Sequence, residues 1–410
     1  MSKKLRIVLV FVVIIEALLL AKFFVFNNTS IFSNEELIKN KVNFNYQSIK
    51  QTNKASALVN LDTNQVIYQN NMSQAQPVYS VSKTMLLATV AKEMEKNNIS
   101  YDKPVIVTKL IDKVNTQANF SRANLKSNNS YTIKELFDAT MISSGNDAAI
   151  LLAYEIFGSH ERAVIQMNNN AKEWGMKDSS FVSTSGLDGK YLKKIGIKAE
   201  EGKNMMSAKD AITLTKLVMK KYPEVVDSGS KVSETIGKPG QGAYLKLETV
   251  NDILEGADQG YKGIYGLKTG SNIEKYSDCI ISLRKDKYNQ HLAAVSFGSK
   301  SREDLYKDVL TLYKYTNQVE AVNLQDGTDL AVKVGLSSKP VQVASKKPFY
   351  LYVPKNQSFE YTLTPNDKYN KLLSGYFGVK KGDEVGTIKI ENLEEFFGGT
   401  PDQEIKAVIK

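Results

Sequence analysis

Apolar residues recur at two different periods along the chain, and these periods predict a mixed α and β protein. Helical spacing marks residues 82–96, 133–142 and 148–157. Short extended runs at 57–61 and 65–68 flank the turn-forming sequence Asp62-Thr63-Asn64 and therefore predict a pair of strands.

Three further strand-like runs follow one another between about residues 262 and 299. They are Gly263–Leu267, Cys279–Leu283 and Leu292–Phe297. Short polar connectors join them, which favours an antiparallel meander. Because predicted helices precede and follow this meander, we expect an α+β domain whose antiparallel sheet is flanked by helices.

Helix starts are marked by a capping residue followed three positions later by an acidic residue. The pairs are Thr132 with Glu135, Ser207 with Asp210 and Ser301 with Asp304. Pro223 is expected to end the second of these helices. After about residue 316 the helical period stops and short extended runs predict a separate β-rich domain.

The N-terminus has the pattern of a membrane signal. Three basic residues in the first six precede an apolar stretch over 7–26 that is interrupted by Glu16 and Lys22. This stretch is long enough to span a bilayer, and no clear small-residue cleavage site follows it. We expect an uncleaved anchor with the rest of the chain outside the cytoplasm; a removed signal peptide and a buried helix are the alternatives.

These patterns predict four segments. Residues 1–26 form a cytoplasmic tip and signal-anchor, 27–46 a polar linker, 47–317 the α+β domain, and 318–410 the β-rich domain.

Composition excludes several kinds of chemistry. The 410 residues include only two histidines, His160 and His291, and one cysteine, Cys279. They are too few for a zinc site built from Cys and His, and an intramolecular disulfide is impossible. The net charge of +10 is spread along the chain without a basic run, so we expect no nucleic-acid partner. We predict no metal and no cofactor.

A serine hydrolase with so few histidines is expected to use lysine as its base. Ser80 and Lys83 are three residues apart at the start of a predicted helix, so they share one helical face. A neutral amine can take the proton of the serine hydroxyl, and both the positive helix end and a second cation would lower the pKa of the lysine.

The Ser-x-x-Lys spacing also occurs in three other places. These pairs are Ser100 with Lys103, Ser228 with Lys231, and Ser282 with Lys285. Only the pair of Ser80 and Lys83 leads an apolar helix that could hold it rigidly, which singles it out as the candidate nucleophile and base.

Two more short motifs complete a candidate site. Ser144-Gly145-Asn146 lies between two predicted helices, where the hydroxyl can pass a proton and the amide can bind a substrate backbone. Lys268-Thr269-Gly270 ends the first meander strand, where a cation and a hydroxyl can hold a carboxylate and glycine permits close approach.

The ordered set Ser-x-x-Lys, Ser-x-Asn and Lys-Thr-Gly resembles that of penicillin-binding proteins and class A β-lactamases. The surrounding sequence is similar to the low-molecular-mass penicillin-binding proteins, the serine-type D-alanyl-D-alanine carboxypeptidases of the peptidase S11-like family. The likeness covers roughly residues 50 to 390, including Phe181 to Leu187 and Gly375 to Gly386. It implies a penicilloyl serine transferase fold, related to β-lactamases and transpeptidases, followed by a small β-rich domain.

The resemblance also implies roles for individual residues. Ser80 would attack the penultimate D-alanine of a peptidoglycan stem peptide with Lys83 as base, and β-lactams would inhibit it covalently. Ser144 and Lys268 would assist proton transfer, and Asn146 and Gly270 would line the substrate site. Backbone N–H groups of Ser80 and Ser271 would form the oxyanion hole. Thr269, with Arg302 as a second contact, would bind the terminal carboxylate.

Departures from the family pattern leave other functions open. Ser271-Asn272 replaces the usual residues after Lys-Thr-Gly, and Glu391 to Lys410 lack the family's amphipathic anchor helix. A membrane-tethered β-lactam-binding or sensing protein with little turnover is one alternative, and a transpeptidase side activity is another. A class A β-lactamase would need a deacylating glutamate that the sequence does not offer convincingly.

Overall fold

The computed structural model describes residues 49–117, 120–238, 244–272, 277–326, 340–355, 361–366, 380–390 and 404–410, and the strands at 32–33 and 331–334. By its contacts the chain separates into two compact units. The larger unit contains Asn45–Asp62 and Val66–Thr316, and the smaller contains Thr63–Gln65, Asn317–Lys410 and the strand at 32–33. The domain boundaries expected from the sequence stay predictions.

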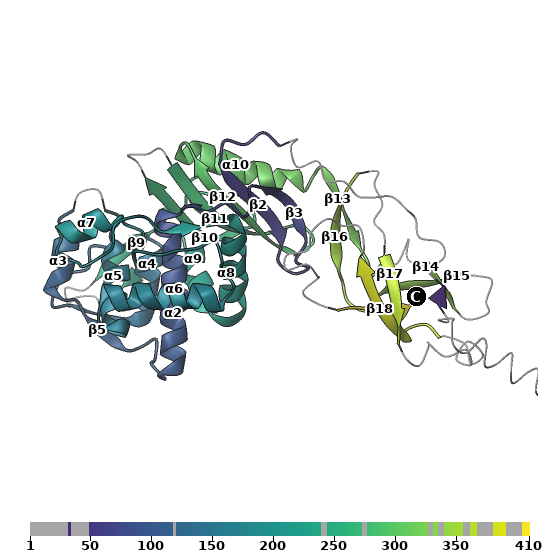
Figure 1. Ribbon diagram of the computed structural model, residues 1–410, viewed down its shortest axis with the longest axis horizontal. Coiled ribbons are helices and arrows are strands. Elements are labelled where there is room, and N and C mark those ends of the chain that lie inside the picture. Colours follow the sequence, from purple (N-terminus) through teal and green to yellow (C-terminus); the bar gives the residue numbers. More distant parts are fainter. Residues whose placement is uncertain are drawn as a thin grey trace, which may run out of the picture. The chain divides into compact units, whose positions relative to one another are not determined.

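The larger unit contains a five-stranded antiparallel sheet with helices on either side of it (Figure 1). Its order is β10-β11-β12-β2-β3. Strands β2 and β3 come first in sequence within this sheet, and β2 pairs with β12, which comes last. The strands are β2 (Ala55–Asn60), β3 (Val66–Asn70), β10 (Ile264–Asn272), β11 (Ser277–Lys285) and β12 (His291–Ser299). The predicted strand pair and the predicted meander are both confirmed.

Helices cover both faces of this sheet, which explains why β11 and β12 are buried over most of their length. Helix α10 packs on β11 and β12, α8 packs on β12 and β2, and α9 packs on β10. The helices are α2 (Lys83–Lys96), α3 (Lys109–Asn115), α4 (Ile133–Met141), α5 (Asn146–Phe157), α6 (His160–Glu173), α7 (Gly189–Lys194), α8 (Ala208–Lys221), α9 (Pro223–Ser230) and α10 (Arg302–Tyr315). The α+β class predicted from the sequence is therefore confirmed.

Short pairs of strands connect these helices. They are β4 (Gln76–Pro77) with β7 (Met205–Met206), β5 (Pro104–Ile106) with β6 (Ser130–Thr132), and β8 (Ser233–Ile236) with β9 (Leu245–Glu248). Strand β4 lies directly before the turn that carries Ser80.

The predicted helix starts are confirmed by their capping bonds. Thr132 and Glu135 form a reciprocal capping box at the start of α4. The side chains of Ser207 and Ser301 accept hydrogen bonds from the backbone N–H groups three residues on, at the starts of α8 and α10. Pro223 does more than end α8: it begins α9, because a proline in the first turn of a helix loses no intrahelical hydrogen bond.

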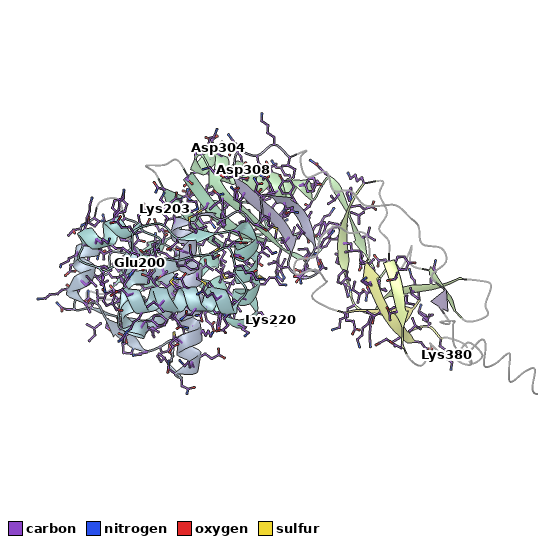
Figure 2. All side chains as sticks on the ribbon, in the orientation of Figure 1. Glu200, Lys203, Lys220, Asp304, Asp308 and Lys380 are labelled. Carbon is purple, nitrogen blue, oxygen red and sulfur yellow. The ribbon has the colours of Figure 1, made fainter. Side chains whose placement is uncertain are left out.

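Asp308 joins helix α10 to the segment before β2 and to the end of β12. Figure 2 labels this residue. The Asp308 carboxylate accepts hydrogen bonds from the backbone and side chain of Thr52, both at 2.9 Å, and from Ser299 Oγ at 2.9 Å. The segment before β2 and the end of β12 are therefore held to the helix that begins at Arg302.

The smaller unit is built from β-strands. Its six-stranded sheet has the order β1-β14-β15-β19-β18-β17, and a separate pair joins β13 (Val319–Asn323) to β16 (Tyr350–Pro354). The sheet strands are β1 (Phe32–Ser33), β14 (Ala331–Val334), β15 (Pro340–Ser345), β17 (Tyr361–Pro365), β18 (Glu384–Ile390) and β19 (Ile405–Ile409). The β-rich character expected after residue 316 is confirmed for the described strands.

The apolar stretch over 7–26 lies outside the described residues. Among the residues that the structure describes, no helix has both the length and the apolar character needed to cross a membrane.

Candidate active site

Ser80 lies in a single 3-10 turn, Tyr79–Ser82, that runs directly into α2. Lys83 is the first residue of α2, and its side chain is completely buried. Its Nζ lies 2.8 Å from Ser80 Oγ, 2.7 Å from Asn146 Oδ1 and 2.6 Å from the backbone oxygen of Ser185. The two amide-type oxygens can accept both N–H bonds of a neutral amine, so the lone pair of the amine then faces the Ser80 hydroxyl.

The surroundings of Lys83 favour that neutral form. Burial lowers the pKa of Lys83 well below its usual value of 10.5, and the positive charge of Lys268 lowers it further. Asp147 opposes the shift. A lysine whose pKa is lowered in this way is more readily neutral, and a neutral amine can act as a general base.

The Ser144-Gly145-Asn146 loop connects α4 to α5, as the sequence predicts. It is held by two backbone bonds, from Gly145 N to Ala139 O at 3.0 Å and from Asn146 N to Ser121 O at 2.9 Å. Ser144 has a φ of 56°, in the left-handed region. This conformation persists where the surrounding structure enforces it, which is common at functional sites.

Asp147 fixes the other side of the same loop. Its buried carboxylate accepts hydrogen bonds from Ala123 N, Leu125 N and Ala148 N at 2.9 to 3.0 Å. Burial raises the pKa of Asp147, and the bonds from these backbone N–H groups act against that shift. No periodicity or motif in the sequence marks Asp147 as part of the site, because its partners at Ala123 and Leu125 lie in an irregular segment.

Lys268 meets the Ser144 loop from the opposite side, on strand β10. Its Nζ donates to Ser144 Oγ at 2.9 Å and to the backbone oxygen of Thr269 at 3.0 Å. Burial together with the nearby charge of Arg302 lowers the pKa of Lys268 to about 7. Ser144 is therefore paired with a cation that can lose its proton near neutral pH.

Strand β10 approaches the backbone of Ser80 very closely at Gly270. A Cβ atom on Gly270 would lie 2.8 Å from Val78 O and 3.0 Å from Ser80 N, so no larger residue fits there without displacement. One residue further, Ser271 Oγ accepts a hydrogen bond of 2.6 Å from Arg302 Nη2. Ser80 and Arg302 thus lie beside two consecutive residues, Gly270 and Ser271, of the edge strand β10.

The structure brings the three short motifs around one place. Lys83 bonds to Asn146 from the second motif, and Ser144 bonds to Lys268 from the third. Thr269 lies beside them, with Oγ1 at 3.5 Å from Val250 O. Of the nine residues predicted for the site, none lies on an unrelated part of the described fold.

The other three Ser-x-x-Lys pairs are engaged elsewhere. Lys103 forms an ion pair with Glu155, Ser228 donates to Asp138, and Ser282 accepts from Tyr313. Within the described residues, a serine to lysine hydrogen bond at this spacing occurs at Ser80 and Lys83.

The match to a known protein family decides the class. A family profile described as D-alanyl-D-alanine carboxypeptidase, peptidase S11, matches residues 41–301, well over half of the chain. The chain belongs to the peptidase S11 family. It is a serine-type D-alanyl-D-alanine carboxypeptidase of this family, as the sequence resemblance predicts.

Individual S11 relatives agree with this assignment. The D-alanyl-D-alanine carboxypeptidase DacF from Bacillus subtilis is 26% identical over 358 residues, which cover 85% of this chain and 84% of DacF. The D-alanyl-D-alanine carboxypeptidase DacC from Escherichia coli is 23% identical over 376 residues, covering 84% of this chain and 86% of DacC.

Solved structures show the same fold. PBP3 from Streptococcus pneumoniae, a peptidoglycan synthesis regulatory factor, has a TM-score of 0.69 at 22% identity and covers 88% of this chain and 99% of its own. Penicillin-binding protein D2 from Listeria monocytogenes, in its ampicillin-bound form, has a TM-score of 0.52 at 26% identity and covers 65% of this chain and 98% of its own. The transpeptidase-like fold predicted for the larger unit is confirmed.

Two contacts of this S11 site were not found from the sequence. The backbone oxygen of Ser185 is the closest partner of Lys83 Nζ. Gly186, with a φ of +86°, passes so near the active-site turn that a Cβ atom there would lie 2.1 Å from Tyr79 O. The sequence Ser185-Gly186 belongs to the stretch that resembles the family, but neither helical nor strand periodicity marks it as part of the site.

Proposed function

We propose that this S11 carboxypeptidase removes the terminal D-alanine from peptidoglycan stem pentapeptides through an acyl-enzyme on Ser80. The observation that supports the proposal best is the environment of Lys83 Nζ, 2.8 Å from Ser80 Oγ and otherwise surrounded by hydrogen-bond acceptors. Ser80 Oγ attacks the carbonyl carbon of the penultimate D-alanine, and its proton passes to Lys83.

The tetrahedral intermediate carries a negative oxygen, which the backbone N–H groups of Ser80 and Ser271 stabilise. Its collapse breaks the C–N bond. The leaving nitrogen takes a proton from the Ser144 hydroxyl, and Lys268 restores that proton. Lys83 then loses the proton that it took from Ser80 to solvent, and Lys268 regains one from solvent, so both lysines return to their starting states. Water attacks the ester on Ser80 and gives a proton to Lys83, which passes it to the Ser80 oxygen as the shortened peptide leaves.

The substrate is held at both sides of the scissile bond. The side-chain oxygen of Asn146 accepts a hydrogen bond from Lys83, so its amide nitrogen can donate to the substrate backbone. Thr269 binds the terminal carboxylate, and Arg302 adds positive charge through Nη1, a buried atom without a hydrogen-bond partner among the described residues. Gly270 lets the peptide lie close to the strand edge.

β-Lactams are proposed to acylate the same serine. The related D2 protein from Listeria monocytogenes binds ampicillin, and a β-lactam presents a carbonyl and a carboxylate to the same groups as the peptide. The stable ester that results would block Ser80.

Turnover separates the carboxypeptidase from a β-lactam sensor. Purified full-length protein in detergent is expected to release many equivalents of D-alanine from a pentapeptide that ends in D-Ala-D-Ala. The matched control is the same peptide with a terminal L-alanine, which should stay intact. Acylation of one equivalent of protein by penicillin without release of D-alanine would contradict the proposal and favour the sensor. Mass spectrometry of the products formed with an added amine acceptor would reveal transpeptidation.

We also propose that residues 1–26 anchor the protein in the bacterial cell membrane, with the catalytic unit outside the cytoplasm. Positive charge before an apolar stretch supports this orientation. The full chain is then expected to sediment with membranes and to be released by detergent, whereas residues 27–410 should be soluble. Both forms should have the same kcat/KM on small peptides, and recovery of the full chain in the soluble fraction would contradict the anchor.

A further inference from the structure

We propose that Asp138, a buried carboxylate outside the reaction described above, is a positioning residue for the Ser144 and Lys268 pair. It joins α4, which leads to Ser144, to α9, which packs on the strand that carries Lys268. The inference rests on the proposed proton-transfer role of Ser144 and Lys268.

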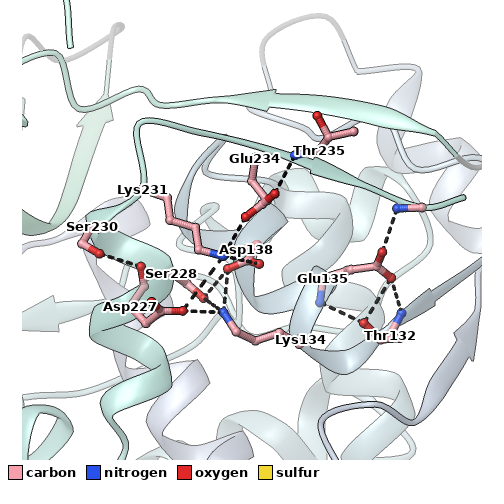
Figure 3. A network of polar contacts seen from close by, with 11 residues as sticks. Thr132, Lys134, Glu135, Asp138, Asp227, Ser228, Ser230, Lys231, Glu234 and Thr235 are labelled. Carbon is pink, nitrogen blue, oxygen red and sulfur yellow. Dashed lines mark hydrogen bonds and ion pairs between the residues drawn. The ribbon is translucent and has the colours of Figure 1, made fainter. Parts of the chain in front are cut away.

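Asp138 lies at the centre of the polar cluster in Figure 3, and its side chain is only 5% exposed. Lys134 Nζ lies 3.0 Å from Oδ1 and Lys231 Nζ lies 3.0 Å from Oδ2. Ser228 Oγ donates a short hydrogen bond of 2.6 Å to Oδ1. Three donors from two helices and the residue after α9 therefore converge on one carboxylate.

The two lysines also contact acidic groups at the rim of the cluster. Lys134 pairs with Asp227 at 2.8 Å, and Lys231 pairs with Glu234 at 2.9 Å. The hydrogen bond from Lys134 lowers the pKa of Asp227. Partial burial acts to lower the pKa of Lys231, but its bonds to Glu234 and Asp138 raise it above the usual value. Replacing Asp138 by a neutral residue would leave the two lysines without the carboxylate that they share.

The Asp138 end of the cluster leads directly to the catalytic loop. The backbone oxygen of Asp138 accepts from Ile142 N at 2.8 Å, and that of Ala139 accepts from Gly145 N at 3.0 Å. Ser144 lies between these two bonded residues in sequence. A shift of the last turn of α4 is therefore transmitted to Ser144 through backbone hydrogen bonds.

The other end of the cluster leads to strand β10 through Gly229. A Cβ atom on Gly229 would lie 2.8 Å from Leu267 O and 3.0 Å from Met141 Cε. Helix α9 consequently lies in direct contact with both α4 and β10, at the residue before Lys268. The three elements therefore contact one another in turn. The cluster joins α4 to α9, Gly229 joins α9 to β10, and the hydrogen bond of 2.9 Å from Lys268 to Ser144 joins β10 to the loop after α4.

This arrangement predicts a defect that depends on the leaving group. An amide nitrogen must be protonated as it leaves, whereas a thiolate, with a thiol pKa of about 8.5, can leave unprotonated. A displaced Ser144 should therefore impair cleavage of an amide far more than cleavage of a thioester with the same acyl group. General loss of folded protein would reduce both rates equally.

The test compares kcat/KM for D-Ala-D-Ala peptides with kcat/KM for acyl-D-alanyl thioesters of a mercapto acid, using full-length protein. Asp138→Asn is expected to lower the amide value about tenfold or more, because small misplacements of catalytic groups are costly, and to change the thioester value less than about threefold. Equal loss on both substrates, or no loss on the amide, would overturn the inference. If Asp138→Asn does not fold, the same comparison is made with Lys231→Met, which removes a partner of Asp138 whose side chain is 24% exposed.

Two further variants make the result specific. Asp210→Asn is the matched control, because Asp210 is a buried helical carboxylate that holds Asp178 N at 2.8 Å and Ser179 Oγ at 2.7 Å, away from the Ser144 loop. It should show no preferential loss on the amide, and such a loss would overturn the assignment to Asp138. Ser144→Ala is the benchmark. If this variant shows no preferential loss of amide cleavage, the proposed role of Ser144 itself is wrong. If it does show that loss but Asp138→Asn behaves like the wild type, only the inference about Asp138 is overturned.

Discussion

Replacing Ser80 by alanine is expected to abolish both covalent labelling by a fluorescent penicillin and release of D-alanine. Alanine removes the oxygen that would form the ester, and no other hydroxyl lies within hydrogen-bond distance of Lys83 Nζ among the described residues. Loss of a serine nucleophile typically lowers turnover by about a millionfold, so both signals should fall to background. Gel fluorescence after penicillin treatment measures the labelling.

The control for this variant is Ser100→Ala, because Ser100 and Lys103 have the same spacing. Ser100 Oγ accepts a bond from Asp102 N, and Lys103 pairs with Glu155. This variant should be labelled like the wild type. Persistent labelling of Ser80→Ala would show that another residue is the nucleophile.

Replacing Lys83 by methionine is expected to slow acylation by penicillin about a hundredfold to ten-thousandfold, the usual contribution of a general base. Methionine roughly keeps the volume of this completely buried side chain, so the fold should persist. Stopped-flow measurement of the acylation rate reports the chemical step without the later hydrolysis.

Lys92→Met is the matched control for that variant. Lys92 lies on the same helix, α2, and contacts Glu173 and Asn170 away from the catalytic serine. Its acylation rate should be close to that of the wild type. An unchanged rate in Lys83→Met would remove Lys83 from the role of base.

Local patterns in the sequence predicted the elements that carry the site. The spacing of Ser80 and Lys83, the capping residues Thr132 and Ser301, and the three strand-like runs are all short-range signals, and the corresponding elements are confirmed. Each depends on residues within one turn or one strand, where periodicity and capping chemistry decide the structure.

Contacts over long sequence distances could not be predicted in the same way. Ser185 is 102 residues from Lys83, and its contribution is a backbone oxygen, which every residue has. Pro223 was expected only to end a helix, because sequence alone does not say whether the next residues fold into another one. Likewise, the role of Gly186 depends on how near the Tyr79 backbone passes.

The lowered pKa of Lys83 was predicted from the sequence, but its largest cause was not. The sequence suggested that a positive helix end and a second cation would lower the pKa. The structure identifies that cation as Lys268, but burial is the largest cause of the shift. The extent of burial depends on the packing of α2, α5 and the Ser185 segment, which is a property of the whole fold.

The central claim is that a neutral Lys83 amine takes the proton of Ser80, and the pH dependence of wild-type acylation tests it most directly. The fraction of neutral amine rises with pH through the lowered pKa of Lys83. With a penicillin whose own charge is constant from pH 5 to 10, the rate constant should therefore rise from acid pH and stop rising well below pH 10. A rate that keeps climbing through pH 10, as an ordinary lysine would give, would contradict the account.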